Sequence, residues 1–386
     1  MAQILTVLAC GAYANAQQPS LERIATGLDN PRGVLVLAED HLIVVEAGNG
    51  FASDDPDQMT GRILALQDRN ADGDFDDAGE RSPLLSQQYT YNGFYGFGTG
   101  RDEVGGLGDI TLFAENRVAY TKDDPRTGYV ADGNSSDIGV GSLDLETGVA
   151  ETLLRRFATV NSLAYDATTG TLYLAASGAN RLLAREPSGE VRVVAVFEPL
   201  ARGQQAVPAG LALDPHTGEV LVALFSGTVY DYYGTRLAFY PGDARVVRVD
   251  PISGRQTVEV EGLTTAVDVA TDEAGNLYVL ELTTVWPSTR LPQGFDLFRQ
   301  DAPPDPGGYQ RYTGRLRMYP PHSRPLTLAE GLDAPTNLTY ADGAVYLSTG
   351  QGTPGRLVLG PDGVRPIAGE LYRLQVPKGS SEQMGP

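Results

Sequence analysis

The chain has 386 residues, 41% of them hydrophobic, and it carries 49 acidic against 29 basic residues, a formal net charge of −20. This balance leaves no basic tract to neutralise phosphates, so it argues against nucleic acid and anionic membranes as partners. We expect a small molecule, a carbohydrate or a protein as the partner, no membrane span, and a monomer. The 46 Gly and 25 Pro fit a turn-dense globular chain.

The first residues have the pattern of an export signal. An apolar run, Ile4 to Ala12, ends in Ala14-Asn15-Ala16, a small-x-small cleavage pattern. We therefore predict a signal peptide over residues 1–16 and an extracytoplasmic protein, periplasmic or secreted; an uncleaved hydrophobic N-terminus is the alternative. The only cysteine is Cys10, so a mature chain from Gln17 has no disulfide or thiolate site. A weak lipobox ends at Cys10, which makes a lipid anchor through it a further alternative.

One sequence pattern recurs six times between residues 30 and 349. It consists of a turn, an apolar strand, a Gly or Asp turn, and a second strand rich in Val, Leu and Tyr. The equivalent points are Gly33, Asp109, Ser162, Gly210, Asp268 and Asn337. A third strand follows, begun for example by Gly61-Arg62 or Gly314-Arg315, and then a fourth. The period-two alternation and the spacing predict an all-β fold, a six-bladed β-propeller of four-stranded blades over residues 21–376.

The last unit predicts how the ring closes. Its third strand, Leu371 to Val376, is followed by a short polar segment that cannot supply a fourth strand. Residues 24–31 parallel residues 328–335, which places a fourth strand near residues 21–27. We predict that this N-terminal strand completes the last blade, which leaves only short, protected edges. Residues 377–386 are predicted to be a disordered tail.

An acidic loop predicts a metal site. Oxygen-bearing side chains stand at every second position, and Gly73 occupies the sixth place of the motif, where a sharp turn is needed. The predicted ligands of a structural Ca²⁺ are Asp68, Asn70, Asp72, Asp74 and Asp76. The twelfth place is Gly79, with Glu80 one residue later, so the loop departs from a full EF-hand. The alternative is an acidic surface turn between a third and a fourth strand.

Long insertions predict where a ligand binds. Residues 47–60, 123–138, 226–243 and 283–313 join second to third strands, which places them on one face of a propeller. The candidate ligand-binding residues at the channel mouth are Arg32, Glu46, Asp109, Asn161, Asp268, Glu281, Asn337, Tyr230, Tyr232 and Trp286. Each could instead brace the loops. Glu46 and Glu281 share a strand face with apolar neighbours, so each buried carboxylate needs Arg32, Lys122 or a cation as its partner.

The residue inventory offers little for catalysis. His41, His216 and His322 all lie in turns on the face opposite the long loops, and nucleophile-elbow, zinc-protease and phosphate-loop motifs are absent. We assign no catalytic residue. The best enzyme hypothesis is a lactonase whose cation is held by Glu46, Asn161 and Asp268.

Four segments carry a resemblance to a family: residues 25–33, 45–48, 206–212 and 276–281. They resemble the ScyD/ScyE family of exported propellers and, more distantly, NHL-repeat and gluconolactonase-type propellers, over most of residues 21–376. The resemblance implies the fold but carries no catalytic motif. Streptogramin lyases and quinone-dependent sugar dehydrogenases resemble this fold but use histidine, which disfavours both. We therefore expect an exported ligand-binding or scaffold module, stabilised by calcium; the alternative is a metal-dependent lactonase-like hydrolase acting at the central channel mouth.

Overall fold

The computed structural model describes residues 20–96, 101–124, 139–155, 159–226, 228–231, 234–237, 239–287, 291–292, 294–299, 301, 304 and 307–376. The predicted signal peptide and the predicted disordered tail lie outside these residues. In the part of the chain that is described, no helix is long and apolar enough to cross a membrane.

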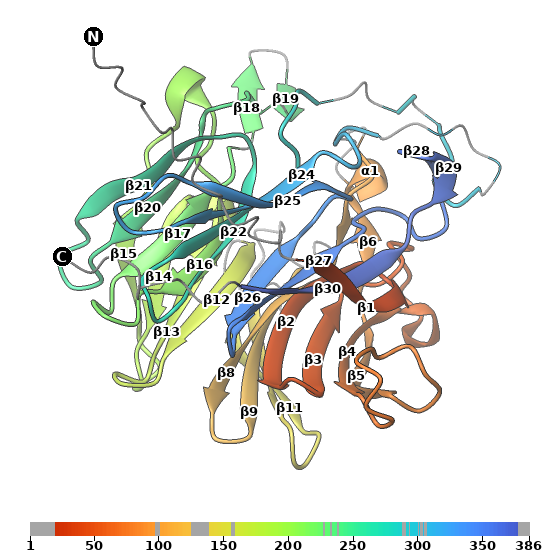
Figure 1. Ribbon diagram of the computed structural model, residues 1–386, viewed down its shortest axis with the longest axis horizontal. Helices are drawn as coiled ribbons and strands as arrows, with labels where there is room; N and C mark the ends of the chain where they lie inside the picture. The colour runs from red at the N-terminus through yellow and green to blue at the C-terminus, as the bar shows by residue number, and fades with distance from the viewer. Residues whose placement is uncertain are drawn as a thin grey trace, which may run out of the picture.

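Six antiparallel sheets of four strands form the predicted propeller, so the predicted fold class is confirmed (Figure 1). Blade one contains β2 (Pro31–Ala38), β3 (His41–Glu46), β4 (Gly61–Gln67) and β5 (Arg81–Gln88). Blade two contains β8 (Leu107–Ala114), β9 (Arg117–Lys122), β10 (Gly139–Asp144) and β11 (Ala150–Arg155). Blade three contains β12 (Val160–Asp166), β13 (Thr171–Ala176), β14 (Arg181–Arg185) and β15 (Val191–Val196).

The other three blades have the same order from the channel outwards. Blade four contains β16 (Pro208–Leu213), β17 (Val220–Leu224), β20 (Ala244–Val249) and β21 (Gln256–Leu263). Blade five contains β22 (Ala266–Thr271), β23 (Leu277–Glu281), β24 (Gly314–Tyr319) and β25 (Leu326–Leu332). Blade six contains β26 (Asn337–Ala341), β27 (Ala344–Thr349), β30 (Gly369–Gln375) and, from the other end of the chain, β1 (Leu21–Leu28).

Strand β1 closes the ring as predicted. It pairs antiparallel with β30, from Leu21 opposite Leu374 to Leu28 opposite Gly369. In Figure 1 the red β1 accordingly lies beside the blue β30. Ile24, Ala25 and Leu28 are buried in a core cluster shared with blade one. The first described strand therefore joins the last blade both through backbone hydrogen bonds and through apolar packing.

Apolar side chains pack between neighbouring blades. One cluster joins Ala119 and Val140 of blade two to Leu163, Leu172 and Leu174 of blade three. Such packing follows from the alternating pattern, because each sheet is covered on both faces by its neighbours. The rigid frame leaves function to the loops at its ends.

The loops on one face carry small elements of their own. Between blades one and two, residues 89–106 contain β6 (Tyr91–Asn92), α1 (Gly93–Gly96) and β7 (Val104–Gly105). Hairpins β18–β19 (Thr228–Asp231, Gly234–Leu237) and β28–β29 (Leu357–Gly360, Gly363–Pro366) belong to blades four and six. Short 3-10 turns occur at Pro56–Gln58, Ser177–Ala179 and Ala201–Gly203. The insertion at residues 89–106 lies outside the four predicted ones.

Candidate functional site

A register shift at the mouth of five blades turns side chains into the central channel. In blade three, Val160 pairs with Ala176 and Ser162 with Ala175, so Asn161 is an extra residue without a partner strand residue. Such a bulge re-aims a side chain that would otherwise lie against a neighbouring blade. Equivalent shifts fall around Gly33, Asp109, Ala209 and Val267 in blades one, two, four and five. In four of these strands two successive residues therefore line the channel, and in blade four Ala209 does so.

The inner layer is a hydrogen-bonded ring across the channel. It consists of the six points that the sequence repeats marked as equivalent: Gly33, Asp109, Ser162, Gly210, Asp268 and Asn337. Four of their side chains accept the next blade's backbone N–H, from Leu163 to Asp109 (2.8 Å), from Leu211 to Ser162 (3.1 Å), from Leu338 to Asp268 (2.8 Å) and from Val34 to Asn337 (3.1 Å). The ring thus ties the six first strands together.

The two glycines of the ring are required by close approach. A Cβ atom at Gly33 would lie 2.6 Å from the backbone nitrogen of Ile110, and one at Gly210 would lie 2.2 Å from Asp268 Oδ1. A glycine has no side chain to accept the backbone N–H of the next blade. In those blades the ring aspartate accepts the N–H of the residue that follows it: Ile110 N donates to Asp109 Oδ1 and Val269 N donates to Asp268 Oδ1, both at 2.9 Å. The order Gly-Asp-Ser is followed by Gly-Asp-Asn around the channel.

One amide bridges the two aspartates of the ring. Asn337 Nδ2 donates to Asp268 Oδ2 at 2.9 Å and to Asp109 Oδ1 at 3.2 Å. Burial raises the pKa of Asp109, although the donors around it oppose this. Burial and the charge of Asp109 raise the pKa of Asp268 well above its usual range. Burial in the ring therefore disfavours the charged forms of both aspartates, since only neutral donors contact them.

A cavity of about 850 Å³ lies above this ring. Its floor is an outer layer that consists of Thr336 of blade six and of the re-aimed positions Arg32, Gly108, Asn161, Ala209 and Val267. Among the described residues that line it, Arg32 is the only basic one, and the acids are Glu103, Asp109, Asp123 and Asp268. A space of this size, enclosed by a rigid frame and a few convergent polar groups, is the usual form of a small-molecule site.

The insertion at residues 89–106 forms one wall of the cavity, and buried polar contacts hold it in place. Asp102 Oδ1 accepts from Asn92 Nδ2 (2.8 Å), Thr353 N (2.9 Å) and Thr353 Oγ1 (2.8 Å), and Asp102 Oδ2 is 2.5 Å from Arg356 Nε. Asp102 N also donates to the backbone oxygen of Gly307 at 3.0 Å. Loops of three blades therefore hold the described part of this wall in position, which lowers the entropy cost of binding.

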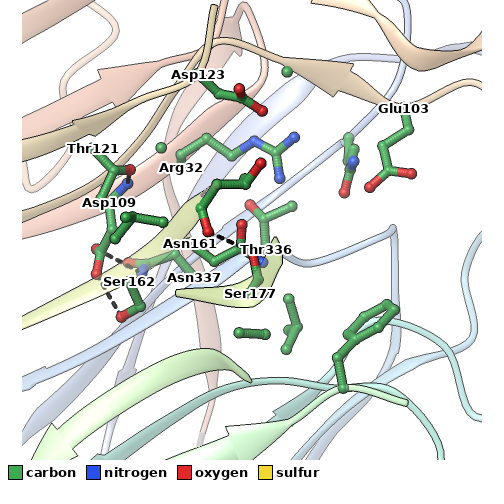
Figure 2. A pocket seen from close by; sticks show the side chains of 18 of the residues that line it. Arg32, Glu103, Asp109, Thr121, Asp123, Asn161, Ser162, Ser177, Thr336 and Asn337 are labelled. Carbon is green, nitrogen blue, oxygen red and sulfur yellow. Dashed lines mark hydrogen bonds between the residues drawn. The ribbon is translucent and has the colours of Figure 1, made fainter. Parts of the chain in front are cut away.

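Arg32 and Asp123 have the polar groups best placed to meet a ligand. Figure 2 shows the guanidinium of Arg32 between the side chains of Asp123 and Glu103. Arg32 donates to the backbone oxygen of Val104, and burial lowers its pKa. Tyr91 Oη donates to Asp123 Oδ2 at 2.8 Å. Burial raises the pKa of Asp123 to about 6, assisted by the charge of Asp124 and opposed by the Tyr91 bond.

The structure brings together half of the predicted ligand-binding residues. Arg32, Asp109, Asn161, Asp268 and Asn337 all line the cavity. Residues that sequence reasoning missed include Tyr91, Glu103, Thr121, Asp123, Ser177, Gln205 and Gln351. Ser162 was marked only as a repeat position, not as a site residue. The missed residues come mainly from loops, whose position no strand repeat predicts.

Glu46 and Glu281 are not among the residues that line the cavity. Each ends a second strand, directly opposite an arginine that begins the third strand, Glu46 opposite Arg62 and Glu281 opposite Arg315. Glu281 accepts from Arg315 Nε (2.9 Å), Arg315 Nη2 (2.6 Å) and Thr264 N (2.9 Å). Glu46 likewise accepts from Arg62 and from Asp29 N. The partners of Glu46 and Glu281 are therefore the arginines of the Gly-Arg pairs that begin the third strands, Arg62 and Arg315. The expected pairing with Arg32, Lys122 or a cation was wrong.

This arrangement changes the expected effect of substituting Glu281. We expect Glu281→Gln to lower the free energy of unfolding by on the order of 2–4 kcal/mol, because an amide N–H₂ would face donors in a buried ion pair. The partial exposure of Arg315, whose side chain is 22% accessible, keeps the loss below that of a fully buried pair. Urea denaturation measures it, with Glu259→Gln in the exposed part of blade four as the control. Equal stability of the two variants would contradict the bracing role.

The predicted aromatic rim is only partly described. Tyr230 lies in β18, where only the backbone is described, and Tyr232 lies outside the described residues. Trp286 is 55% exposed, packs edge-on against Tyr240 at 5.5 Å, and does not line the cavity. Arg202 lies over the other ring of this pair, 4.8 Å from the centroid of Tyr240. Trp286 therefore belongs to a surface stack that braces loops.

The cation site of the lactonase hypothesis does not assemble. Glu46 is held by Arg62, away from Asn161 and Asp268, and both oxygens of Asp268 accept backbone N–H groups. Among the described residues, no group of three His, Cys, Asp or Glu side chains could hold a metal ion. No histidine occurs among the described residues that line the cavity. The proposed ligand set of Glu46, Asn161 and Asp268 was therefore wrong.

In the acidic loop after β4, the side-chain oxygens bind the loop's own backbone. Asp68 accepts from Ala71 N (2.6 Å) and Gly73 N (2.9 Å), and Asp74 accepts from Asp76 N (2.9 Å). Asp72 accepts from Asp74 N and from the Asn70 side-chain amide. Asp76 accepts from Thr26 N at 2.9 Å, and the backbone N–H of the buried Phe75 donates to the Ile24 carbonyl at 2.8 Å. These contacts attach the loop to β1, and calcium binding here stays a prediction.

Calcium binding by this loop has a direct thermal test. If Asp68, Asn70, Asp72, Asp74 and Asp76 exchange N–H contacts for an ion, the melting temperature should fall when chelator replaces calcium, since a ligand that binds only the folded state stabilises it. Asp72→Ala should abolish this difference, whereas Asp54→Ala in another acidic loop should keep it. Identical melting of the unchanged protein in calcium and chelator would show an acidic turn without an ion.

Comparison with known proteins supports the fold alone. No protein-family model and no curated protein matches the chain. A glucose dehydrogenase-like oxidoreductase from Thermus thermophilus superposes with a TM-score of 0.51 at 18% identity, over 92% of this chain and 99% of that one. The PQQ-bound aldose sugar dehydrogenase of Streptomyces coelicolor gives 0.48 at 15% identity, over 92% and 98%. A gluconolactonase from Xanthomonas campestris gives 0.47 at 12% identity, over 93% and 90%.

The superposition on the Thermus thermophilus structure supports the β-propeller fold and nothing finer. Identities this low carry no activity across, because one fold supports many unrelated functions.

Proposed function

We propose that the protein is an exported propeller that binds a small molecule in the cavity above the ring of Asp109, Ser162, Asp268 and Asn337. The observation that carries this proposal is the set of bulges at the channel mouth. They interrupt regular strand pairing and aim Arg32 and Asn161 into the cavity, and natural proteins use such bulges next to active sites. Export, and membership of the ScyD/ScyE family, are proposed from the N-terminal pattern and the repeated segments.

A binding role fits the chemistry of the cavity better than hydrolysis does. Both ring aspartates are bound on all sides by N–H and O–H donors, so neither is free to act as a nucleophile. Asp123 holds a hydrogen bond from Tyr91 and faces the cavity, where it can accept a ligand proton donor. A wall that buried hydrogen bonds hold in place favours retention of a ligand.

Saturation-transfer NMR with a panel of amino acids, hexoses, sugar acids and aromatic acids tests the proposal. We expect signals from at least one class, and Ala209→Trp should abolish them because the added ring fills the cavity from its floor. Ile252→Ser, at a turn residue that is 93% exposed, is the control and should keep them. Signals that persist in both Ala209→Trp and Val267→Phe, with both variants folded, would place binding elsewhere.

A further inference from the structure

The lining of the cavity is divided into a polar half and an apolar half. Blades one to three contribute most of the polar groups, Arg32, Asn161, Thr121 and Asp123, with Glu103 beside them in the wall and Val104, Leu107 and Val160 as apolar members. Blades four and five contribute mainly apolar groups, Val207, Ala209, Phe225, Val267 and Leu282, with Gln205 and Asp268 as polar members. A ligand that fills the space must therefore present a polar end to one side and an apolar body to the other, because burying a polar group without a partner is costly.

The charged groups of the polar half keep hydrogen-bonding capacity for a ligand. Three hydroxyls are already used by the protein: Thr121 Oγ1 accepts from Asp109 N, Ser177 Oγ donates to the Thr159 carbonyl, and Thr336 Oγ1 donates to the Pro31 carbonyl. Arg32, in contrast, has its one hydrogen bond within the described residues to Val104. Asp123 Oδ1, the Asn161 amide and the Glu103 carboxylate have no hydrogen-bonding partner among the described residues.

Two kinds of unused group therefore face the same end of the cavity. Arg32 offers only donors and Asp123 offers only an acceptor, so together they match a ligand end that carries an acceptor anion beside a donor cation. A simple carboxylate would meet Arg32 but would be repelled by Asp123 and Glu103. A simple amine would meet Asp123 but would be repelled by the guanidinium of Arg32.

We propose that the cavity recognises the zwitterionic head of an apolar α-amino acid, its carboxylate on Arg32 and Asn161, its ammonium on Asp123, and its side chain against Phe225, Val267 and Leu282. This inference rests on the proposed binding function and gives it a ligand class. A free amino acid and the same group at the end of a larger molecule share this chemistry. The size of the cavity leaves space for an aromatic side chain.

Calorimetric titration of the full chain separates the groups of the head. L-phenylalanine is the probe, hydrocinnamate is the same body without the ammonium, phenethylamine is the same body without the carboxylate, and glycine is the head without the body. We expect L-phenylalanine to bind at least about tenfold more tightly than the other three, since each loses a charge-assisted hydrogen bond or the apolar contact. N-acetyl-L-phenylalanine amide, in which both charged groups of the head are blocked, should bind at least about tenfold more weakly than L-phenylalanine.

Variants assign each half of the head to its residue. Arg32→Gln should reduce the affinity for L-phenylalanine at least about tenfold without reducing that for phenethylamine. Asp123→Asn should likewise reduce the affinity for L-phenylalanine at least about tenfold, and it should raise that for hydrocinnamate, because the repelling carboxylate is gone. The matched controls are Arg299→Gln and Asp301→Asn, an exposed pair outside the cavity. Circular dichroism confirms that each variant is folded.

The pH dependence gives a readout that a structural role would not produce. Because the pKa of Asp123 is about 6, affinity for L-phenylalanine should fall about tenfold between pH 7 and pH 5, and Asp123→Asn should remove this slope. If hydrocinnamate binds as tightly as L-phenylalanine, the zwitterion assignment is overturned in favour of an anion site. Binding of a hexose alone would overturn it while the proposed binding function stands. Loss of every signal from the cavity would overturn both.

Discussion

Deletion of residues 1–28 should abolish cooperative folding of the whole propeller instead of fraying one end. The deletion removes β1, whose Ile24, Ala25 and Leu28 are buried between blades six and one. Burial of a Leu or Ile side chain contributes roughly 1.5–3 kcal/mol, and the backbone hydrogen bonds of a paired strand add to this, against a typical total of about 5–15 kcal/mol. The loss therefore approaches the entire stability of the fold.

The deletion also exposes a new sheet edge. Without β1, the edge of β30 from Gly369 to Leu374 presents unpaired backbone groups, which favours aggregation. The contacts of the acidic loop with Thr26 and Ile24 are lost at the same time. The matched control is deletion of residues 1–19, which keeps every residue of β1. Thermal melting and sedimentation compare the two forms, and equal melting temperatures would refute closure by this strand.

Replacement of Asn337 should produce the second large effect. Asn337→Leu removes the amide that bridges Asp109 and Asp268 and the oxygen that accepts from Val34 N. We expect the free energy of unfolding at neutral pH to fall by about 3–5 kcal/mol, because two buried carboxylates then face each other without the donor between them. Thr339→Val is the control, since it removes one bond to the same blade, from Thr339 Oγ1 to the Val34 carbonyl at 2.7 Å, and should cost about 1 kcal/mol.

The loss in Asn337→Leu should shrink at acidic pH. The pKa values of Asp109 and Asp268 are raised in the folded state, so the folded protein binds protons that the unfolded chain releases. Stability linked to these groups is therefore present at low pH and lost as pH rises through their folded pKa values. Removal of the bridging donor should raise the pKa of Asp109 further, because the Asn337 amide favours its charged form. Urea denaturation across pH 5 to 8 should show the largest difference in the free energy of unfolding between Asn337→Leu and the unchanged protein at the alkaline end. A difference that does not change with pH, or that equals the difference for Thr339→Val, would exclude a charged ring.

The Asn337→Leu variant also bears on the cavity, since Asn337 is one of its lining residues. The six ring positions were recognisable in the sequence, because each blade repeats the same turn and strand at that point. Their contacts were not, since a hydrogen bond such as that from Asn337 to Asp109 joins residues 228 positions apart. The true roles of Glu46 and Glu281 were likewise hidden, because these residues share a pattern with channel residues and yet pair with arginines on the next strand of their own blade.

The sequence by itself determined the elements that repeat: six blades, the limits of most strands, and closure by residues near the N-terminus. Alternation of period two and the turn residues act locally, so each copy reports the same structure independently. The tertiary structure decided which polar residues meet. The wall that contains Tyr91 and Glu103, the raised pKa of Asp123 and the position of Arg32 all depend on irregular loops and on bulges, whose geometry follows from packing among distant segments and not from any local pattern.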